Sequence, residues 1–166
     1  MAELTPTERL QPSLLDRLTD EEPARSQESR NRRVLSIQKL RESVLRDVAW
    51  LLNTTNMADA TLAERYPHVA QSVVNYGLPD LAGVTATAVD VAELESLVRQ
   101  AILDFEPRIL RNTLQVKAHT GEEMNHNALV FEIHGELWAQ PVPLELFLKT
   151  EIDLESGDIA VSEVPR

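Results

Sequence analysis

The sequence has no cysteine and few aromatic residues, which make up 4% of its 166 residues. Without cysteine it can form neither a disulfide framework nor a cysteine-ligated zinc site, and we expect a protein of a reducing compartment. With so few aromatic side chains, aliphatic side chains have to fill most of the core. The five glycines are scattered, so no glycine-rich phosphate-binding loop is predicted.

No segment carries a signal for export or membrane insertion. The N-terminal stretch MAELTPTERLQPSLLDRL has neither the basic start nor the apolar run of a signal peptide. No other apolar run approaches the roughly 18 residues that a transmembrane helix needs. We therefore expect a cytoplasmic protein without direct membrane insertion.

The motifs of common catalytic and metal sites are also missing. The histidines show no HExxH pattern and no spacing that would place two metal ligands on one helix face; they are His68, His119, His126 and His134. No GxSxG motif for a nucleophilic serine is present. The sequence therefore predicts no metal site, no cofactor and no catalytic residue of these kinds.

The formal net charge is −11, and residues 119–166 alone hold ten acidic and two basic residues. This balance argues against nucleic acid as a partner, because phosphate binding depends on clustered lysine and arginine. One local exception is RNRR at 30–33, which has no nearby aromatic residue to stack on a base. It is either a solvated approach to a helix or a contact for an acidic partner.

Residues 1–35 are polar and contain proline, and we expect them to form a mobile N-terminal docking segment. One short apolar patch interrupts this segment, with Leu14, Leu15 and Leu18 at helical spacing. The patch is either part of a frayed terminus or a short docking peptide on a mobile tether. Residues 36–166 are expected to form a single domain.

Three helices are predicted in this domain, at about 36–53, 66–75 and 91–105. The first and the third carry an apolar stripe at helical spacing, and Ser36 and Asp90 are suitable N-caps for them. The expected buried side of the second helix consists of Val69, Val73 and Tyr76.

After the third helix the period of the apolar residues changes from 3.6 to 2, which is typical of strands. Residues 128–138 alternate apolar side chains with Glu132, His134 and Glu136, and a turn at 156–158 leads into a short final strand. The sequence thus predicts an α+β fold, in which N-terminal helices pack on a C-terminal antiparallel β-meander at about 111–163.

The third helix is expected to end in DFEPRI, residues 104–109. Proline at 107 removes a backbone donor and moves Glu106 out of the helical region, so the corner is stiff. Glu106 and Arg108 then either clamp the junction of helix and strand internally or project as a fixed charged knob for another protein. A glycosidase with Glu106 as general acid and Asp104 or Glu132 as its partner is the enzymatic alternative. Arg108 argues against it, because a neighbouring guanidinium favours the charged carboxylate.

Several motifs resemble the family of type VI secretion baseplate subunits called TssE, a branch of the phage baseplate wedge proteins with an old "lysozyme-like" label. The resemblance runs from about residue 9 to 163 and rests on five segments: RLQPSLLDRLTDEEP, SVLRDVAWLLNT, YPHVAQSVVNYGLPDLAG, AILDFEPRI and FEIHGELWAQPVPLELFLKTEIDLESG. Most specific are NYGLPDL at 75–81 and Glu-Pro-Arg at 106–108.

The resemblance implies a non-catalytic structural subunit of a cytoplasmic baseplate docked at the inner membrane complex. Its partners would be TssF, TssG and TssK, contacted through Glu106, Pro107 and Arg108, which favours the outward knob. Its C-terminal strands would start assembly of the contractile sheath TssB/TssC, and an unpaired edge with Ile159 and Val161 is the expected template for strand addition. The alternative function is a muramidase-type hydrolase that cleaves peptidoglycan, which the resemblance does not support.

Overall fold

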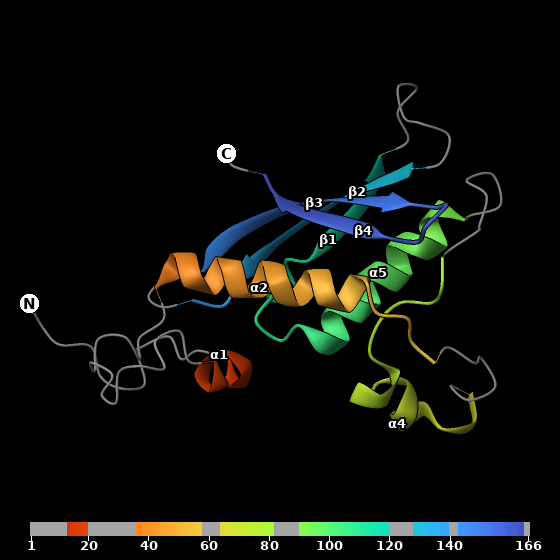
Figure 1. Cartoon of the computed structure of the whole chain (residues 1–166), viewed down its shortest axis with the longest axis horizontal. Coiled ribbons are helices and arrows are strands. Elements are labelled where there is room, and N and C mark those ends of the chain that lie inside the picture. Colours follow the sequence, from red (N-terminus) through yellow and green to blue (C-terminus); the bar gives the residue numbers. More distant parts are fainter. Residues whose placement is uncertain are drawn as a thin grey trace, which may run out of the picture.

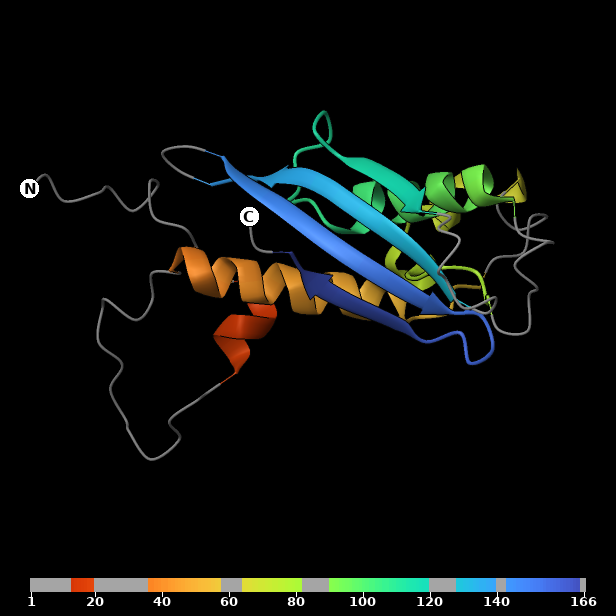
Figure 2. The same ribbon diagram turned by 90° about the horizontal axis from the view of Figure 1, so that it is seen from above.

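The computed structural model describes residues 13–19, 36–57, 64–81, 90–119, 128–139 and 143–164. In this part of the chain, helices pack on one face of a four-stranded antiparallel sheet (Figures 1 and 2), so the predicted α+β fold is confirmed. The elements follow in the order α1 (Leu14–Leu18), α2 (Ile37–Leu52), α4 (Pro67–Ala70), η2 (Val73–Asn75), α5 (Val91–Phe105), β1 (Gln115–His119), β2 (Ala128–Leu137), β3 (Leu144–Asp153) and β4 (Ile159–Glu163).

The sheet is a simple meander with strand order β1-β2-β3-β4, so β1 and β4 form its two edges. Antiparallel pairing aligns Ile133 with Leu148, and Ile152 with Ile159. Because side chains alternate along a strand, this register places the buried apolar residues of the four strands on the face that meets α2 and α5. The predicted alternation in β2 is confirmed, since Phe131 is fully buried whereas Glu132 is exposed.

Helices α2 and α5 confirm the predicted apolar stripes and caps. The Ser36 hydroxyl accepts a hydrogen bond from the Lys39 N–H at 3.1 Å, and the Asp90 carboxylate accepts from the N–H groups of Ala92 and Glu93. These bonds satisfy donors that the first turn of a helix leaves free. The helical side of the core consists of Leu40, Val44, Val48, Leu51, Leu52, Leu94, Val98, Ala101 and Ile102.

The predicted helix at 66–75 is wrong in its extent. The structure has the single turn of α4, a break at residues 71–72, and then the 3-10 turn η2. The side chains of Ser72 and Asn75 bond to main-chain groups of Val69 and Ala70, an alternative to the helical ladder that these residue types favour. Val73, expected on the buried side, is 82% exposed as a result.

Helix α1 confirms helical structure around Leu14, Leu15 and Leu18, and it lies against the side of α2 that faces away from the sheet (Figures 1 and 2). All three leucines are exposed, at 70%, 42% and 75%. The expected mobility of residues 1–35 concerns mainly positions outside the described residues, as does the RNRR cluster. Within the described part of the chain, no helix has the length and apolar character needed to cross a bilayer.

Candidate functional site

The Glu-Pro-Arg corner lies where α5 gives way to the sheet. Helix α5 ends with Glu106 as its C-cap, whose N–H donates to the Ile102 carbonyl at 2.9 Å. Pro107 follows and is exposed, and Ile109 then forms an antiparallel bridge with Leu137 at the end of β2. Two further main-chain bonds, between residues 108 and 138 and between residues 110 and 136, fasten the corner to β2.

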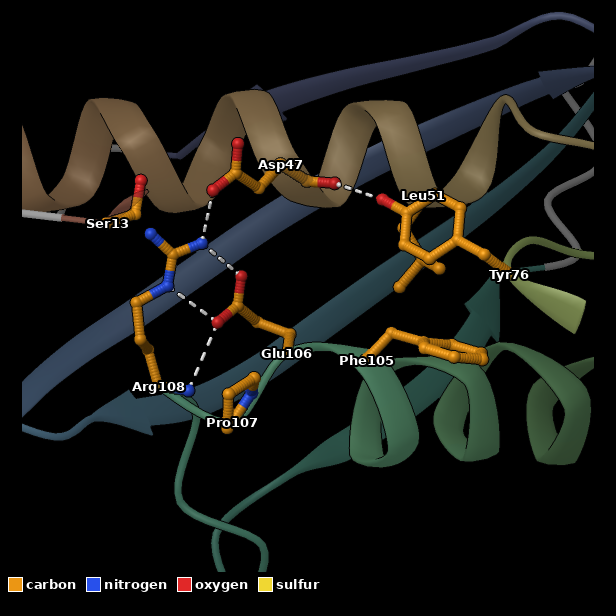
Figure 3. A pocket seen from close by; sticks show the side chains of 8 residues that line it. All are labelled: Ser13, Asp47, Leu51, Tyr76, Phe105, Glu106, Pro107 and Arg108. Carbon is orange, nitrogen blue, oxygen red and sulfur yellow. Dashed lines mark hydrogen bonds and ion pairs between the residues drawn. The ribbon is translucent and has the colours of Figure 1, made fainter. Parts of the chain in front are cut away.

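The side chains of Glu106 and Arg108 bind each other rather than solvent (Figure 3). Arg108 Nε donates to Glu106 Oε1 at 2.7 Å, and Arg108 Nη2 donates to Glu106 Oε2. The Arg108 main-chain N–H also donates to Oε1, at 3.1 Å. With 4% of its surface exposed, Glu106 is buried, and the paired geometry is the strong bidentate form of an arginine–carboxylate interaction.

The same guanidinium reaches across to α2. Arg108 Nη2 donates to Asp47 Oδ2 at 2.6 Å, and Arg108 Nη1 donates to the Ser43 hydroxyl at 3.2 Å. Burial alone lowers the pKa of Arg108, but its hydrogen bonds and charge interactions with Glu106 and Asp47 outweigh burial and hold this pKa above its ordinary value. The corner is therefore tied to α2 by a fully charged arginine.

Sequence reasoning missed Asp47 and Ser43, which lie one helical turn apart on α2. Their separation from Arg108, 61 and 65 residues, left no local signal that the three side chains meet. One sign was available, because Ser43 is a polar residue inside the apolar stripe of α2 and is 5% exposed. A polar side chain in such a position usually serves a buried hydrogen bond.

Ion pairs extend from the corner to α1. Arg46 Nε donates to Asp47 Oδ1 at 2.8 Å, and Arg46 Nη1 donates to Asp16 Oδ1 at 2.6 Å. Five side chains of alternating charge thus connect α1, α2 and the corner. Partial burial by itself raises the pKa of Asp16. Its bonds to Arg46 and Ser13 lower this pKa by more than burial raises it, so the pKa lies below its ordinary value.

A groove of about 340 Å³ opens beside this network (Figure 3). One wall is charged, with Asp47, Glu106 and Arg108, and the other carries apolar surface from Tyr76 and Phe105. The two aromatic rings meet edge to face, with their centroids 5.2 Å apart. The groove thus has one wall of charged side chains held by ion pairs and one wall formed by two aromatic rings.

Asp16→Ala is expected to release α1 without unfolding the rest of the chain. Helix α1 has five residues and no buried side chain, too few to persist without a tertiary contact, and Asp16 supplies its ion pair to α2. Amide hydrogen exchange at residues 16–19 should become much faster, while the melting temperature stays within about 2 °C. Arg17→Ala, an exposed change in the same helix, is the control. Unchanged exchange in the Asp16 variant would contradict this role of the ion pair.

A pH titration of the wild type tests the same contact. Because the pKa of Asp16 is lowered by folding, its contribution to docking is present above the ordinary carboxylate range and is lost as the pH falls through the lowered value. Helix α1 should therefore detach only in strongly acidic solution, and the Asp16→Ala variant should show no such step.

The structure brings together the three residues predicted to bind wedge partners but turns Glu106 inward. The expectation that the carboxylate and the guanidinium project together as a knob is wrong for Glu106, because both of its oxygens accept bonds from Arg108 inside the chain. Pro107 is exposed and the Arg108 side chain is 23% exposed, so these two can still be reached from outside. Contact of the corner with another protein stays a prediction.

The other predicted partner residues, Ile159 and Val161, lie on β4 at the edge of the sheet. The side chain of Ile159 belongs to the core and is 6% exposed, while Val161 is half-buried. Any contribution of Ile159 to a partner must therefore come through its main chain. Strand addition at this edge also stays a prediction.

The carboxylates proposed for a hydrolase do not share a cleft. Glu106 lies in the groove on the helical side, whereas Glu132 lies on the opposite face of the sheet, where it pairs with His119 at 2.9 Å. Asp104 accepts hydrogen bonds from Gln100, one turn earlier on α5. Both oxygens of Glu106 are occupied by Arg108, so neither is placed to pass a proton to a substrate.

The described residues also contain no group of three potential metal ligands. His134 stacks on Phe147 with a ring separation of 4.1 Å, and His68 lies in α4 with its surface exposed. His126 falls outside the described residues.

Comparison with known proteins gives one family. The family model described as baseplate wedge protein gp25 matches residues 38–142, which covers α2, α5, the Glu-Pro-Arg corner, β1 and β2. No curated protein and no solved structure matches the chain significantly.

Proposed function

The chain belongs to the family of baseplate wedge protein gp25, and from this membership we propose that it is a structural subunit of a type VI secretion baseplate, related to TssE. Baseplate wedge proteins serve assembly, and the buried Glu106–Arg108 pair gives the chain a rigid corner of the kind that an assembly contact needs. This corner is the observation on which the proposal mainly depends.

The partners at the corner are the other wedge proteins, TssF and TssG, with TssK in the same baseplate. Support comes from the exposed ring of Pro107, the partly exposed guanidinium of Arg108 and the groove between them and the aromatic wall. A segment of a partner that fills the groove could bury the apolar wall and accept hydrogen bonds from Arg108. Binding to a preformed corner loses little conformational entropy, which favours a stable contact.

The second contact of the proposal is with the contractile sheath, TssB/TssC, through β4. An edge strand presents main-chain N–H and C=O groups to which an extended segment of another chain can pair. The acidic surplus of residues 119–166 favours a partner segment of opposite charge and opposes pairing between two copies of this chain. The place of action is the cytoplasmic baseplate, which its other components dock at the inner membrane complex.

Pro107→Glu tests the corner contact. Pro107 is exposed and takes no part in the hydrogen bonds of Glu106 and Arg108, so a larger side chain can be placed there, and a carboxylate on the rim should oppose a partner that approaches Arg108. We expect at least a tenfold loss in co-purification with TssF and TssG, and a melting temperature within about 2 °C of the wild type.

Ser96→Glu adds the same charge to an exposed position of α5 and is the control, which should co-purify as well as the wild type. Undiminished recovery of TssF and TssG with Pro107→Glu, in a folded protein, would show that the corner is not the wedge contact.

A further inference from the structure

The outer edge of β4 has a defined set of main-chain groups. The N–H of Val164 donates to the Phe147 carbonyl, so Val164 faces β3, and alternation turns Ala160 and Ser162 the same way. Ile159, Val161 and Glu163 consequently direct their N–H and C=O groups outward. A strand that adds to β4 would pair with these three residues.

The main-chain groups of Ile159, the first of these three residues, already form hydrogen bonds with the side chain of Asn53. Asn53, the C-cap of α2, donates from Nδ2 to the Ile159 carbonyl at 2.7 Å and accepts from the Ile159 N–H at its Oδ1 at 2.9 Å. A primary amide that does both reproduces the pair of bonds that a residue of an antiparallel strand would make there. The second hydrogen of Nδ2 goes to the Ala49 carbonyl at 2.8 Å, which fixes the orientation of the amide.

The other end of β4 is held from the same helix. Arg41 forms an ion pair with the Glu163 side chain, and its Nη2 donates at 2.9 Å to the carbonyl of Glu145, on β3 just beyond the end of β4. Helix α2 thus engages the edge at both ends of β4. Between these contacts, the outward N–H and C=O groups of Val161 have no partner among the described residues.

The opposite edge of the sheet is protected with a charged group instead. On β1, the N–H of Ala118 donates to the Glu95 carboxylate of α5 at 2.6 Å, and the carbonyl of Leu114 accepts from Arg99 at 3.4 Å. A strand adding there would have to displace a charged acceptor, whose hydrogen bond to the N–H is stronger than that of a neutral amide. The neutral amide at β4 can be exchanged for a peptide group, which has the same donor and acceptor.

We propose that Asn53 occupies the place of an incoming strand at Ile159 and makes β4 the edge at which a strand is exchanged. The incoming segment first pairs with the free groups of Val161 and then replaces the Asn53 amide at Ile159. This proposal rests on strand addition by the sheath pair, proposed above. It assigns to Asn53 a competing role, in which the amide closes the edge of the free protein and sets how far the added strand extends.

Two apolar side chains of the elements that meet at this edge are only half-buried in the free protein. Leu45 of α2 and Val161 of β4 pack against the core but keep part of their surface exposed, and they belong to the two elements that meet at this edge. An added strand beside β4 would cover apolar surface that the free protein leaves open. Burial of that surface offsets the loss of the Asn53 contacts.

Asn53→Ala tests the proposal with the purified TssB/TssC pair as the probe. Without the competing amide, the dissociation constant for the pair should fall by roughly five- to tenfold, because two hydrogen bonds no longer have to be given up. Hydrogen exchange adds a positional readout. The Ile159 amide should be protected in the free wild type, unprotected in the free variant, and protected again when the variant binds the sheath pair.

Two checks keep the result decisive. Slow exchange of the Ala160 and Ser162 amides verifies that β4 still pairs with β3 in the variant. Should Asn53→Ala disturb the fold, Asn53→Ser shortens the side chain and removes the amide that both donates to and accepts from Ile159, and a smaller gain in affinity is then expected. Glu95→Ala opens the β1 edge in the same way and should leave the sheath affinity unchanged.

The possible outcomes test the sheath contact and the competing role of Asn53 separately. No binding of TssB/TssC by the wild type, with a folded protein, overturns the sheath contact itself. Binding by the wild type with equal or weaker binding by the folded Asn53 variants overturns only the competing role of Asn53. An Ile159 amide that stays unprotected in the complex of Asn53→Ala overturns the exchange, because the added strand then stops before reaching Ile159.

Discussion

Arg108→Ala is expected to lower the melting temperature of the isolated protein by roughly 6–12 °C. The change leaves the carboxylate of Glu106, which is 4% exposed, without its guanidinium partner, and it also removes the bond to Asp47. Breaking a buried ion pair from one side costs about 3–5 kcal/mol, and the lower value applies here because Arg108 keeps 23% of its side chain exposed. At this chain length, about 1 kcal/mol corresponds to roughly 2–4 °C.

A double-mutant cycle isolates the pair. Removing Glu106 as well, in the Glu106→Ala, Arg108→Ala variant, should recover part of the loss, because no buried carboxylate then remains unpaired. Arg111→Ala is the matched control, since Arg111 is 71% exposed, lies 4.0 Å from Asp104 and donates one solvent-exposed hydrogen bond to the Leu103 carbonyl. It should shift the melting temperature by less than about 2 °C, as exposed ion pairs contribute little. A shift that small in Arg108→Ala would show that the clamp does not stabilise the fold.

This stability effect changes how mutations in the corner have to be interpreted. A variant of Glu106 or Arg108 that no longer co-purifies with wedge partners can fail because the corner has lost its shape. Pro107 is the position where added charge tests the contact while both partners of the clamp are kept, because its side chain is exposed. Within the corner, the side chain of Glu106 is thus buried, whereas Pro107 is exposed to solvent.

The helices and strands were predictable wherever capping residues and the spacing of apolar residues decide them. Ser36 and Asp90 accept the predicted capping bonds, and the change of period after α5 marks the start of the sheet correctly. The region 66–75 was not predictable in this way. Its apolar residues have helical spacing, but the side chains of Ser72 and Asn75 bond to the main chain and break the helix.

Only the part of the candidate site formed by neighbouring residues could be predicted from the sequence. Glu106, Pro107 and Arg108 are neighbours in sequence, and the stiff corner follows from proline. The contact with Asp47 depends on the packing of α2 against α5, which no periodicity specifies. The contact of Asn53 with Ile159 joins residues 106 positions apart, so sequence alone indicated the edge of β4 but not the amide that closes it.

Gly77→Ala is expected to lower the melting temperature by roughly 6–12 °C, the second large effect. Gly77 has φ +119°, a conformation that other residues rarely adopt, and an added Cβ would lie 2.0 Å from the Thr54 carbonyl oxygen. That oxygen accepts the Leu78 N–H at 2.8 Å in a parallel bridge between the segment after α2 and the segment after η2. Main-chain atoms on both sides cannot move aside without breaking this bridge, which explains the glycine of the NYGLPDL motif.

Gly135→Ala is the control for this prediction, because it tests the same change under different geometry. An added Cβ at Gly135 meets the Cγ2 atom of the Ile109 side chain at 3.1 Å, and Gly135 has no positive φ. A side chain can shift by a few tenths of an ångström, so the loss should be smaller, about 1–2 kcal/mol. Thermal unfolding of both variants, with hydrogen exchange at Asn56 and Leu78, measures the difference. Equal melting temperatures for Gly77→Ala and the wild type would contradict the main-chain clash, and slow exchange at Leu78 would show the bridge intact.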